Sequence, residues 1–306
     1  MRKLELTAQA EDEGDRLDRV IARRGGIARG EARRALDRGG VWVEGRRVKA
    51  ASRTVRQGQR IAVVLEEAGR TEPTLEGLSD AQVLFEDRHL IAVDKPPFVP
   101  AQATLGSDRG TLPKLVEARV GGPVGLVHRL DLETSGVTVF GKTKAATTAL
   151  AAAFRGGAAH KRYLVAAVGA LAAEGRIDLP LSPDPRRRGR FLASERGNIS
   201  AATRYRVLAR RGLLCAVELF PQTGRTHQIR SHLAALETPI LGDKLYGGPG
   251  EIEVEGRPLR ASRMLLHARA LELPHPATGA PLRLEAPMPE DLREALLLAG
   301  TDPAQF

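Results

Sequence analysis

The chain has 306 residues, a length that predicts one large domain or two unequal ones, and we expect two. Its composition, 42% hydrophobic and 27% charged, is that of a folded globular protein and excludes a largely disordered chain. The longest apolar run, residues 163–173, is too short to span a bilayer, and the N-terminal residues lack the apolar core of a signal peptide. We therefore expect a cytoplasmic protein that makes no membrane contact.

The chain contains a single cysteine, Cys215, which excludes an internal disulfide and a zinc site made of several cysteines. This cysteine lies in the apolar segment LLCAVELF. Its surroundings predict a small buried core residue rather than a nucleophile.

The net charge of +10 is concentrated near the N-terminus. Residues 15–60 contain 14 Lys or Arg and five Asp or Glu, a net charge of +9, and 13 of the 14 cations are arginine. The arginine side chain is a fork of donors suited to phosphate, so this segment predicts a polyanionic partner. The alternative is a basic surface that is merely solvated.

Residues 15–38 carry apolar positions at helical spacing and predict two short helices, separated at Gly25 and Gly26 and ended by Gly39 and Gly40. Two extended segments follow, residues 41–50 and 54–65, with turns at residues 44–45 and 57–59.

The strings RLDRVIA, ARGEARRALDRGGVWVEGRRV and VRQGQRIAV resemble the RNA-binding domain named after the fourth protein of the small ribosomal subunit. We expect this domain to occupy residues 1–68. The arginines predicted to contact RNA are Arg16, Arg29, Arg33, Arg34, Arg46 and Arg47.

A polar segment rich in turn formers, EEAGRTEPTLEGLSD, predicts a linker over residues 69–80. The second domain is expected to span residues 81–306. Its extended segments VLFED, LIAVDK, KRYLVAAVG, TRYRVLA and LLCAVELF outnumber its predicted helices, KAATTALAAAF and THQIRSHLAAL. Because the strands come in runs, we predict an α+β fold with a mixed, mainly antiparallel sheet.

Residues 136–143, GVTVFGKT, match the phosphate-binding pattern GxxxxGK[ST]. Residues 137–140 are strong strand formers, whereas a phosphate-binding loop needs a flexible turn whose amides surround the phosphates. We therefore predict a strand here, followed by the alanine-rich helix, and expect no nucleotide cofactor.

The preceding segment, HRLDLETSG, contains Asp131 in a dense group of polar residues. From composition alone, Asp131 is either a catalytic residue or a turn former. The string HRLDxxTSG is the signature of the RluA family of pseudouridine synthases, and this sequence resembles the family at every specified position. The resemblance implies that Asp131 is the catalytic aspartate.

Further resemblances follow in the family's order. KRYLVAAVG resembles the tyrosine strand and implies an active-site ring at Tyr163, for which a core aromatic is the alternative. PQTGRTHQIRSHLAALETPILGDKLYG and LHARALELPHPATGAPL resemble the later blocks. Two positions depart from the pattern: Phe98 stands where many members have glycine, and Asn198 where lysine is common.

The implied reaction breaks the bond between uracil and ribose, turns the base and rejoins it through a ring carbon, so it needs no cofactor. A carboxylate can stabilise or capture the electron-poor ribose, as in glycoside chemistry. We expect Arg230 to compensate the charge of Asp131, Arg129 to fill the space of the extruded base, and Tyr163 to stack on it. The predicted substrate-binding residues are Arg129, His128, Arg225, His227 and Gln228.

His128, His227 and His232 lack supporting cysteine or carboxylate at ligand spacing, and we expect no metal site. Arg186 and Arg188, in the run DPRRRGR, are predicted RNA contacts, although a solvated cluster is the alternative. The expected partner is RNA, ribosomal rather than transfer RNA, and the expected state a monomer. The alternative to an enzyme is an RNA-binding or ribosome-assembly factor on the same scaffold.

Overall fold

The computed structural model describes residues 2–65, 77–103, 105, 107–108 and 110–302. The described chain forms two compact units, Met1–Gly77 with Pro100–Arg119, and Leu78–Val99 with Val120–Phe306. The grouping of Pro100–Arg119 with the first unit was not anticipated from the sequence. Most of the predicted linker lies outside the described residues, so the boundaries at 68 and 80 remain predictions.

The first unit combines two helices, α1 and α2, with a small antiparallel sheet in the strand order β1-β4-β2-β3, and it also includes a third helix, α3. Its elements are β1 (Arg2–Thr7), the 3-10 helix η1 (Ala10–Asp12), α1 (Leu17–Gly25), α2 (Arg29–Arg38), β2 (Val41–Val43), β3 (Arg46–Arg47), β4 (Arg60–Leu65) and α3 (Leu112–Val120). Both helices end at glycines in the left-handed conformation, Gly26 at φ +59° and Gly39 at φ +82°. A residue with a Cβ atom is disfavoured there, which explains why the predicted helix ends are correct.

The second unit is an α+β domain, as predicted. Its elements are η2 (Asp80–Gln82), β5 (Val83–Glu86), β6 (Leu90–Lys95), β7 (Gly125–Leu126), β8 (Ser135–Gly141), α4 (Lys144–Arg155), β9 (His160–Val168), β10 (Glu174–Ile177), β11 (Leu181–Pro183), β12 (Phe191–Ala193), β13 (Thr203–Arg211), β14 (Leu214–Pro221), α5 (Gln228–Ala235), β15 (Glu251–Val254), β16 (Arg257–Arg260), β17 (Leu266–Pro274), β18 (Pro281–Glu285) and α6 (Glu290–Ala299).

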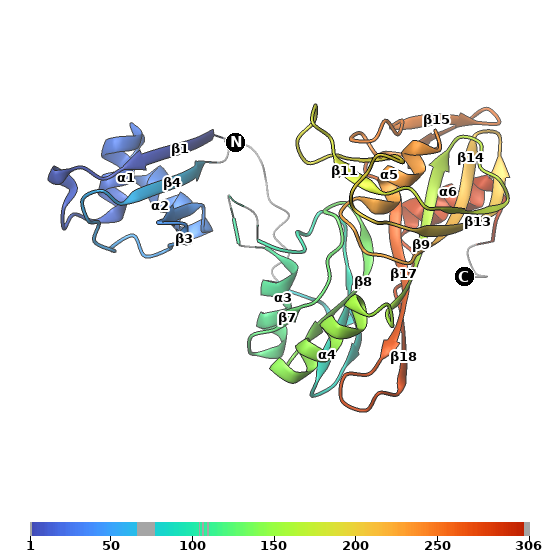
Figure 1. Ribbon diagram of the computed structural model, residues 1–306, viewed down its shortest axis with the longest axis horizontal. Helices are drawn as coiled ribbons and strands as arrows, with labels where there is room; N and C mark the ends of the chain where they lie inside the picture. Colours follow the sequence, from blue (N-terminus) through green and yellow to red (C-terminus); the bar gives the residue numbers. More distant parts are fainter. Residues whose placement is uncertain (1, 66–76, 104, 106, 109, 303–306) are drawn as a thin grey trace. The chain divides into compact units, whose positions relative to one another are not determined.

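Ten of these strands form one sheet, with β10-β13-β14-β9-β17-β8-β6-β5 in order, β18 beside β17 and β7 beside β8. Among the described strands of this sheet, the β8–β17 pair is parallel and the others are antiparallel. Successive side chains of β9 point to opposite faces. Leu164 therefore packs in the cluster of α6, and Val165 in the cluster of α5 (Figure 1).

Cys215 follows the same alternation. It is completely buried on the α5 side of the sheet, which confirms its prediction as a core residue.

Residues 136–141 of the phosphate-loop match lie in strand β8, which is buried along its whole length. The predicted strand is thus confirmed. The helix that follows, α4, begins at Lys144 and is capped by the Thr143 side chain, which accepts a hydrogen bond from the Ala146 amide.

One row across the sheet positions the loop that carries Asp131. Ala268 of β17 pairs with Gly136 of β8 on one side and with Tyr163 of β9 on the other. A Cβ atom on Gly136 would lie 2.2 Å from the backbone oxygen of Ala268, so only glycine permits this approach. The end of the HRLDLETSG segment and Tyr163 are thereby held two strands apart in one sheet.

Candidate active site

A cleft of about 660 Å³ opens in the second unit, and several separate segments line it. Most of its polar lining comes from residues 127–134 before β8, from the start of β9 with Lys161 and Tyr163, and from residues 221–230 at the end of β14 and the start of α5, while residues of α4 and Leu266 of β17 complete the wall. The cleft therefore gathers residues that the sequence places about a hundred positions apart.

Asp131 lies in the first of these segments and lines the cleft. The backbone around it is fixed: the Thr134 amide donates to the Asp131 carbonyl, and the carbonyl of Leu132 accepts from the Phe98 amide. The Leu132 carbonyl also accepts from the amine of Lys95, a completely buried side chain that donates to Pro96 and Val99 carbonyls as well. Three carbonyls match the three donors of an ammonium group, so Lys95 ties the loop to β6.

Burial lowers the pKa of Lys95 to about 7, and Asp131 opposes this shift. Phe98, three residues further on, adopts a left-handed backbone conformation at φ +66°. That conformation explains why glycine is frequent at this position in the pattern that the sequence resembles. The loop keeps its hydrogen bond to Leu132 with phenylalanine in place.

Arg230 of α5 contacts Asp131 directly, with Nη1 donating to Oδ2 at 3.0 Å. Its Nε and Nη2 donate to both carboxylate oxygens of Asp243, at 2.7 and 2.8 Å, in a fork that fixes the guanidinium plane. The guanidinium also lies over the ring of Tyr246, 4.9 Å from its centroid. Asp243 is almost completely buried, and Arg230 is therefore held from one side while it presents a donor to Asp131 on the other.

His227 occupies the N-cap position of α5 in a left-handed conformation, φ +56°, without a capping hydrogen bond from its side chain. Its Nδ1 lies 3.1 Å from the hydroxyl of Tyr246, and its Nε2 lies 3.9 Å from Oδ1 of Asp131. Burial lowers the pKa of His227, with Asp131 acting in the opposite direction. The imidazole thus lies at the edge of the aspartate rather than in hydrogen-bond contact with it.

Tyr163 lines the cleft from β9. Burial raises the pKa of its phenol above the ordinary value, and the negative charge of Asp131 raises it further. The phenol therefore stays protonated at neutral pH, as a hydrogen-bond donor rather than a ready base.

The two exposed arginines predicted to bind substrate line the same cleft. Arg129 donates from Nη2 to the hydroxyl of Thr226 at 3.1 Å, and Arg225 donates from Nε to the Ser200 carbonyl at 3.0 Å. Each uses part of its fork and keeps other donors for a ligand.

His128 and Gln228 line the cleft, and both side chains make hydrogen bonds within the protein. Nε2 of His128 accepts from the Val139 amide at 3.0 Å, the ring stacks on Phe154, and burial lowers its pKa to about 3. The Gln228 amide donates to the Ala202 carbonyl and the Thr203 hydroxyl and accepts from Thr223 and the Arg225 amide. These contacts hold the cleft wall together, and substrate binding by Gln228 stays a prediction.

Sequence reasoning did not single out Lys95, Lys161, Asp243 or Tyr246. Asp243 and Tyr246 lie in the quoted string LGDKLYG, and Lys161 stands two residues before Tyr163. The resemblance therefore covered Asp243 and Tyr246, but nothing in the string shows which of its polar residues face Arg230.

The hairpin β11–β12 carries Arg186 and Arg188, both exposed, in its turn. The hairpin is anchored beside the site, because the Phe191 amide donates to the Tyr246 hydroxyl and Ser231 of α5 donates to the Phe191 carbonyl. The prediction that these two arginines contact RNA is compatible with this placement and stays a prediction.

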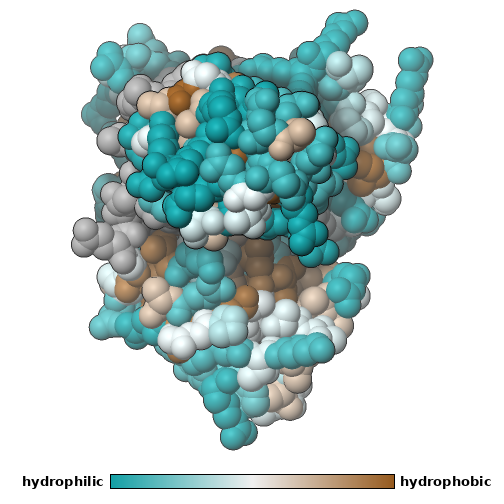
Figure 2. Space-filling view, turned by 90° about the vertical axis from the view of Figure 1, so that its left-hand side faces the viewer, coloured by the Kyte–Doolittle hydropathy of each residue, from teal (hydrophilic) through white to brown (hydrophobic). Residues whose placement is uncertain are grey.

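In the first unit, Arg34 and Arg46 are exposed, and Arg47 lies over Trp42, 4.5 Å from the ring centroid. The side of this unit turned to the viewer in Figure 2 is mainly hydrophilic. Arg16, Arg29 and Arg33 share one buried carboxylate, that of Asp18.

Among the described residues, no group of three or more His, Cys, Asp or Glu side chains is placed to hold a metal ion. Both ring nitrogens of His232 are occupied, one facing the Thr203 hydroxyl and the other the Leu179 carbonyl. Within the same described part, no helix has the length and apolar character needed to cross a membrane.

Comparison with known families assigns each unit a class. Residues 15–61 match the S4 domain, and residues 89–235 match the model described as RNA pseudouridylate synthase. The solved structure of human RNA pseudouridylate synthase domain containing 4 is similar, with a TM-score of 0.58 and 28% identity over 71% of this chain and 92% of that one. An RNA-binding module joined to such a domain defines an RNA-modifying isomerase.

Two curated relatives extend the match to most of the chain. The ribosomal large subunit pseudouridine synthase D of Xanthomonas campestris is 38% identical, covering 82% of this chain and 79% of the relative. The enzyme of the same name from Escherichia coli O157:H7 is 30% identical over 98% of this chain and 96% of the relative. The chain therefore belongs to the RNA pseudouridylate synthase family.

Proposed function

We propose that this enzyme converts specific uridines of large-subunit ribosomal RNA to pseudouridine, with Asp131 as the catalytic residue. The choice of RNA is supported by the names of the relatives. The observation that carries the catalytic assignment is the contact between Asp131 and Arg230 inside the cleft, with Nη1 3.0 Å from Oδ2. The reaction is an isomerisation without redox change, so the proposed enzyme needs neither a nucleotide nor a metal ion. The proposal also includes a cytoplasmic location and a monomeric state.

The reaction breaks the bond between uracil N1 and the ribose and forms one from C5, while a proton leaves C5 and N1 gains one. Asp131 faces the electron-poor ribose carbon and either stabilises or captures it. Arg230 supplies the compensating cation, and its fork on Asp243 keeps Nη1 directed at the carboxylate. Preorganised charge of this kind lowers the barrier because it needs no rearrangement during the reaction.

The target base must leave the RNA stack to reach a cleft of this kind, at a cost of a few kcal/mol. Arg129 is exposed next to the catalytic loop and fills the space that the base leaves. Tyr163 stacks on the extruded uracil, and its protonated phenol can donate a hydrogen bond or a proton to the ring. Arg225 and His227 complete the polar lining around the nucleotide.

The test replaces Asp131 with asparagine, which keeps the size of the side chain and removes the charge. We expect Asp131→Asn to bind RNA with the affinity of the unmodified protein and to form no pseudouridine in chemical mapping of an in vitro ribosomal transcript. The control is Asp178→Asn, which removes an exposed carboxylate paired with Arg176 outside the cleft lining. Full product from Asp131→Asn would disprove the assignment.

A further inference from the structure

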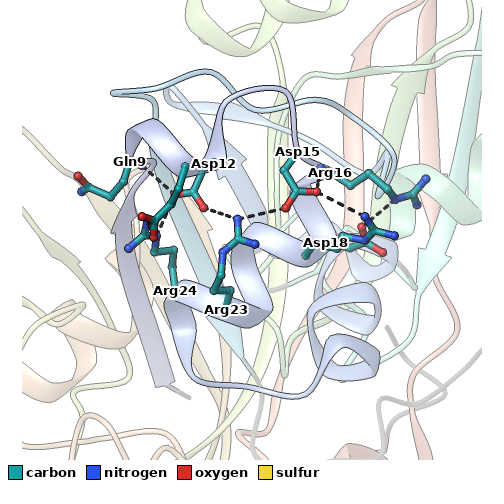
Figure 3. A network of polar contacts seen from close by, with 9 residues as sticks. Gln9, Asp12, Asp15, Arg16, Asp18, Arg23 and Arg24 are labelled. Atoms are coloured by element: carbon teal, nitrogen blue, oxygen red, sulfur yellow. Dashed lines mark hydrogen bonds and ion pairs between the residues drawn. The ribbon is translucent and has the colours of Figure 1, made fainter.

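The arginine-rich first unit contains two carboxylates that are completely buried, Asp12 and Asp18. Each holds two or more arginine side chains, and Figure 3 shows Asp12 with Arg23 and Arg24, and Asp18 with Arg16. The groups differ in charge. This difference gives the arginines around Asp18 a physical setting that the arginines around Asp12 do not share.

The group around Asp12 is electrically balanced. Asp12 accepts from Arg23 Nη2 at 2.5 Å and from Arg24 Nε at 2.8 Å. Arg23 also pairs with Asp15, Arg24 with Glu11, and Arg19 with Asp15. Three acidic residues thus face three arginines, and the formal sum of their charges is zero.

The group around Asp18 carries an excess of positive charge. Its single carboxylate accepts from Arg16 Nε at 3.1 Å, from Arg29 at 2.9 Å and from Arg33 Nε at 2.8 Å. Three arginines face one aspartate, which leaves a formal charge of +2. The arginine side chains remain 37%, 41% and 52% exposed, whereas the aspartate side chain is 0% exposed.

The unused donors of this group point to a ligand with several oxygens. Arg16 and Arg33 reach Asp18 through Nε, and among the described residues the terminal nitrogens of both forks have no hydrogen-bond partner. Arg29 is the first residue of α2, and Arg33 lies one turn later on the same face. Cations are unfavourable at the positive end of a helix, so this placement favours an anion nearby.

Asp18 is needed because three guanidinium groups repel one another. Burial by itself would raise the pKa of Asp18, but hydrogen bonds from Arg33, Arg16 and Arg29 outweigh it and hold the pKa well below the ordinary value. The carboxylate therefore stays ionised and keeps the three forks in one place before any ligand arrives. Preorganisation reduces the ordering cost of binding, and three convergent forks suit phosphate oxygens.

We propose that Asp18 gathers Arg16, Arg29 and Arg33 into a binding site for the phosphate backbone of RNA, and that the balanced group around Asp12 is not part of it. Asp18 is a positioning residue that acts through the arginines. The inference rests on the proposed function for the identity of the ligand, since RNA is the polyanion on which the enzyme acts.

The first experiment compares Arg33→Gln with Arg23→Gln in the full chain. The two variants are matched, because each removes one positive charge at an arginine that a buried aspartate holds. The side chains of Arg33 and Arg23 are also similarly exposed, at 52% and 45%. The probe is an in vitro transcript of large-subunit ribosomal RNA, titrated at several salt concentrations. We expect Arg33→Gln to weaken binding severalfold and to reduce the slope of log K against log salt by about 1, and Arg23→Gln to change neither. Equal losses would overturn the proposal.

The second experiment tests Asp18 by the sign of its effect. Asp18→Asn and Asp12→Asn both add one positive charge, so a purely additive charge effect predicts tighter RNA binding for both. If Asp18 positions the three arginines, Asp18→Asn alone should weaken RNA binding, by about tenfold. Asp18→Glu keeps a carboxylate and should recover part of the RNA affinity. Tighter binding by Asp18→Asn would refute the positioning role, and thermal unfolding of each variant identifies a loss that comes from misfolding.

Mapping pseudouridine on the same transcript keeps the two proposals distinguishable. If the unmodified protein binds the transcript but converts no uridine, the proposed function fails, whereas the contrast between Arg33 and Arg23 still tests the phosphate site.

Discussion

Lys161 brings a titratable cation to the wall of the cleft. Its amine donates to the Thr223 carbonyl at 2.7 Å, and burial together with the nearby Arg225 lowers its pKa to about 8. The ammonium is thus charged at neutral pH and loses its proton just above it. RNA is a polyanion, so we expect the protonation state of this group to affect substrate binding more directly than it affects the reaction proposed at Asp131.

We therefore expect the KM for RNA to rise severalfold between pH 7 and pH 9, because Lys161 becomes neutral as the pH passes its pKa. In Lys161→Gln the KM should be high at pH 7 and should lack this rise. Steady-state kinetics over that pH range are the measurement, with Lys144→Gln as a control that removes an exposed lysine outside the cleft lining. A rise of unchanged size in Lys161→Gln would assign the effect to another group.

At the level of elements, the parallel contact between β8 and β17 determines where the loop that carries Asp131 ends. Gly136 has φ +114°, and a Cβ atom there would meet the backbone of Ala268 at 2.2 Å. The three atoms nearest to that Cβ all belong to the backbone of Ala268, so no flexible side chain could move aside. The glycine at the end of HRLDLETSG is thus explained by packing, whereas the aspartate five residues before it faces the cleft.

Gly136→Ala should lower the free energy of unfolding by about 3 kcal/mol or more, since it combines a forbidden backbone conformation with a steric clash. Gly121→Ala is the matched control: Gly121 has φ +71° but no atom within 4 Å of the added Cβ, so we expect a loss of about 1–2 kcal/mol. Denaturant unfolding measures both. Equal losses in the two variants would show that β8 moves away from β17 at little cost.

At the scale of the whole molecule, charge and chemistry are divided between the two units. Residues 15–60 carry a net charge of +9, whereas every residue that lines the cleft belongs to the second unit. The first unit is therefore expected to supply affinity for RNA and the second the isomerisation.

Deletion of residues 1–68 should weaken binding to large ribosomal transcripts and flatten the dependence of affinity on salt, because most of the phosphate-binding cations are removed. Binding titrations at several salt concentrations check this. Because Pro100–Arg119 groups with the first unit, thermal unfolding of the truncated chain is a necessary control. An unchanged salt slope in a folded truncated protein would contradict the division of roles.

Several features of the fold follow from local rules, and the sequence predicts them well. Glycines at φ +59° and +82° end α1 and α2 where expected, and the strand formers after Gly136 outweigh a literal phosphate-loop match. These predictions depend on residues close together in the chain, where backbone preference decides the outcome. The grouping of Pro100–Arg119 with the first unit depends on long-range packing and was not foreseen.

The candidate site divides in the same way. The sequence by itself determined which loop carries the aspartate, through its resemblance to a family, and which segment carries the arginines. Only the tertiary structure decided which side chains contact one another. Arg230, 99 residues from Asp131 in the sequence, donates to its carboxylate and is held by Asp243. The amide of Gln228 donates to groups in the cleft wall. In the first unit, the tertiary structure brings three arginines to Asp18 and pairs three others with nearby acidic side chains. The physical reason is that a side chain's donors are satisfied by whatever folding brings within about 3 Å, and sequence spacing does not encode that distance.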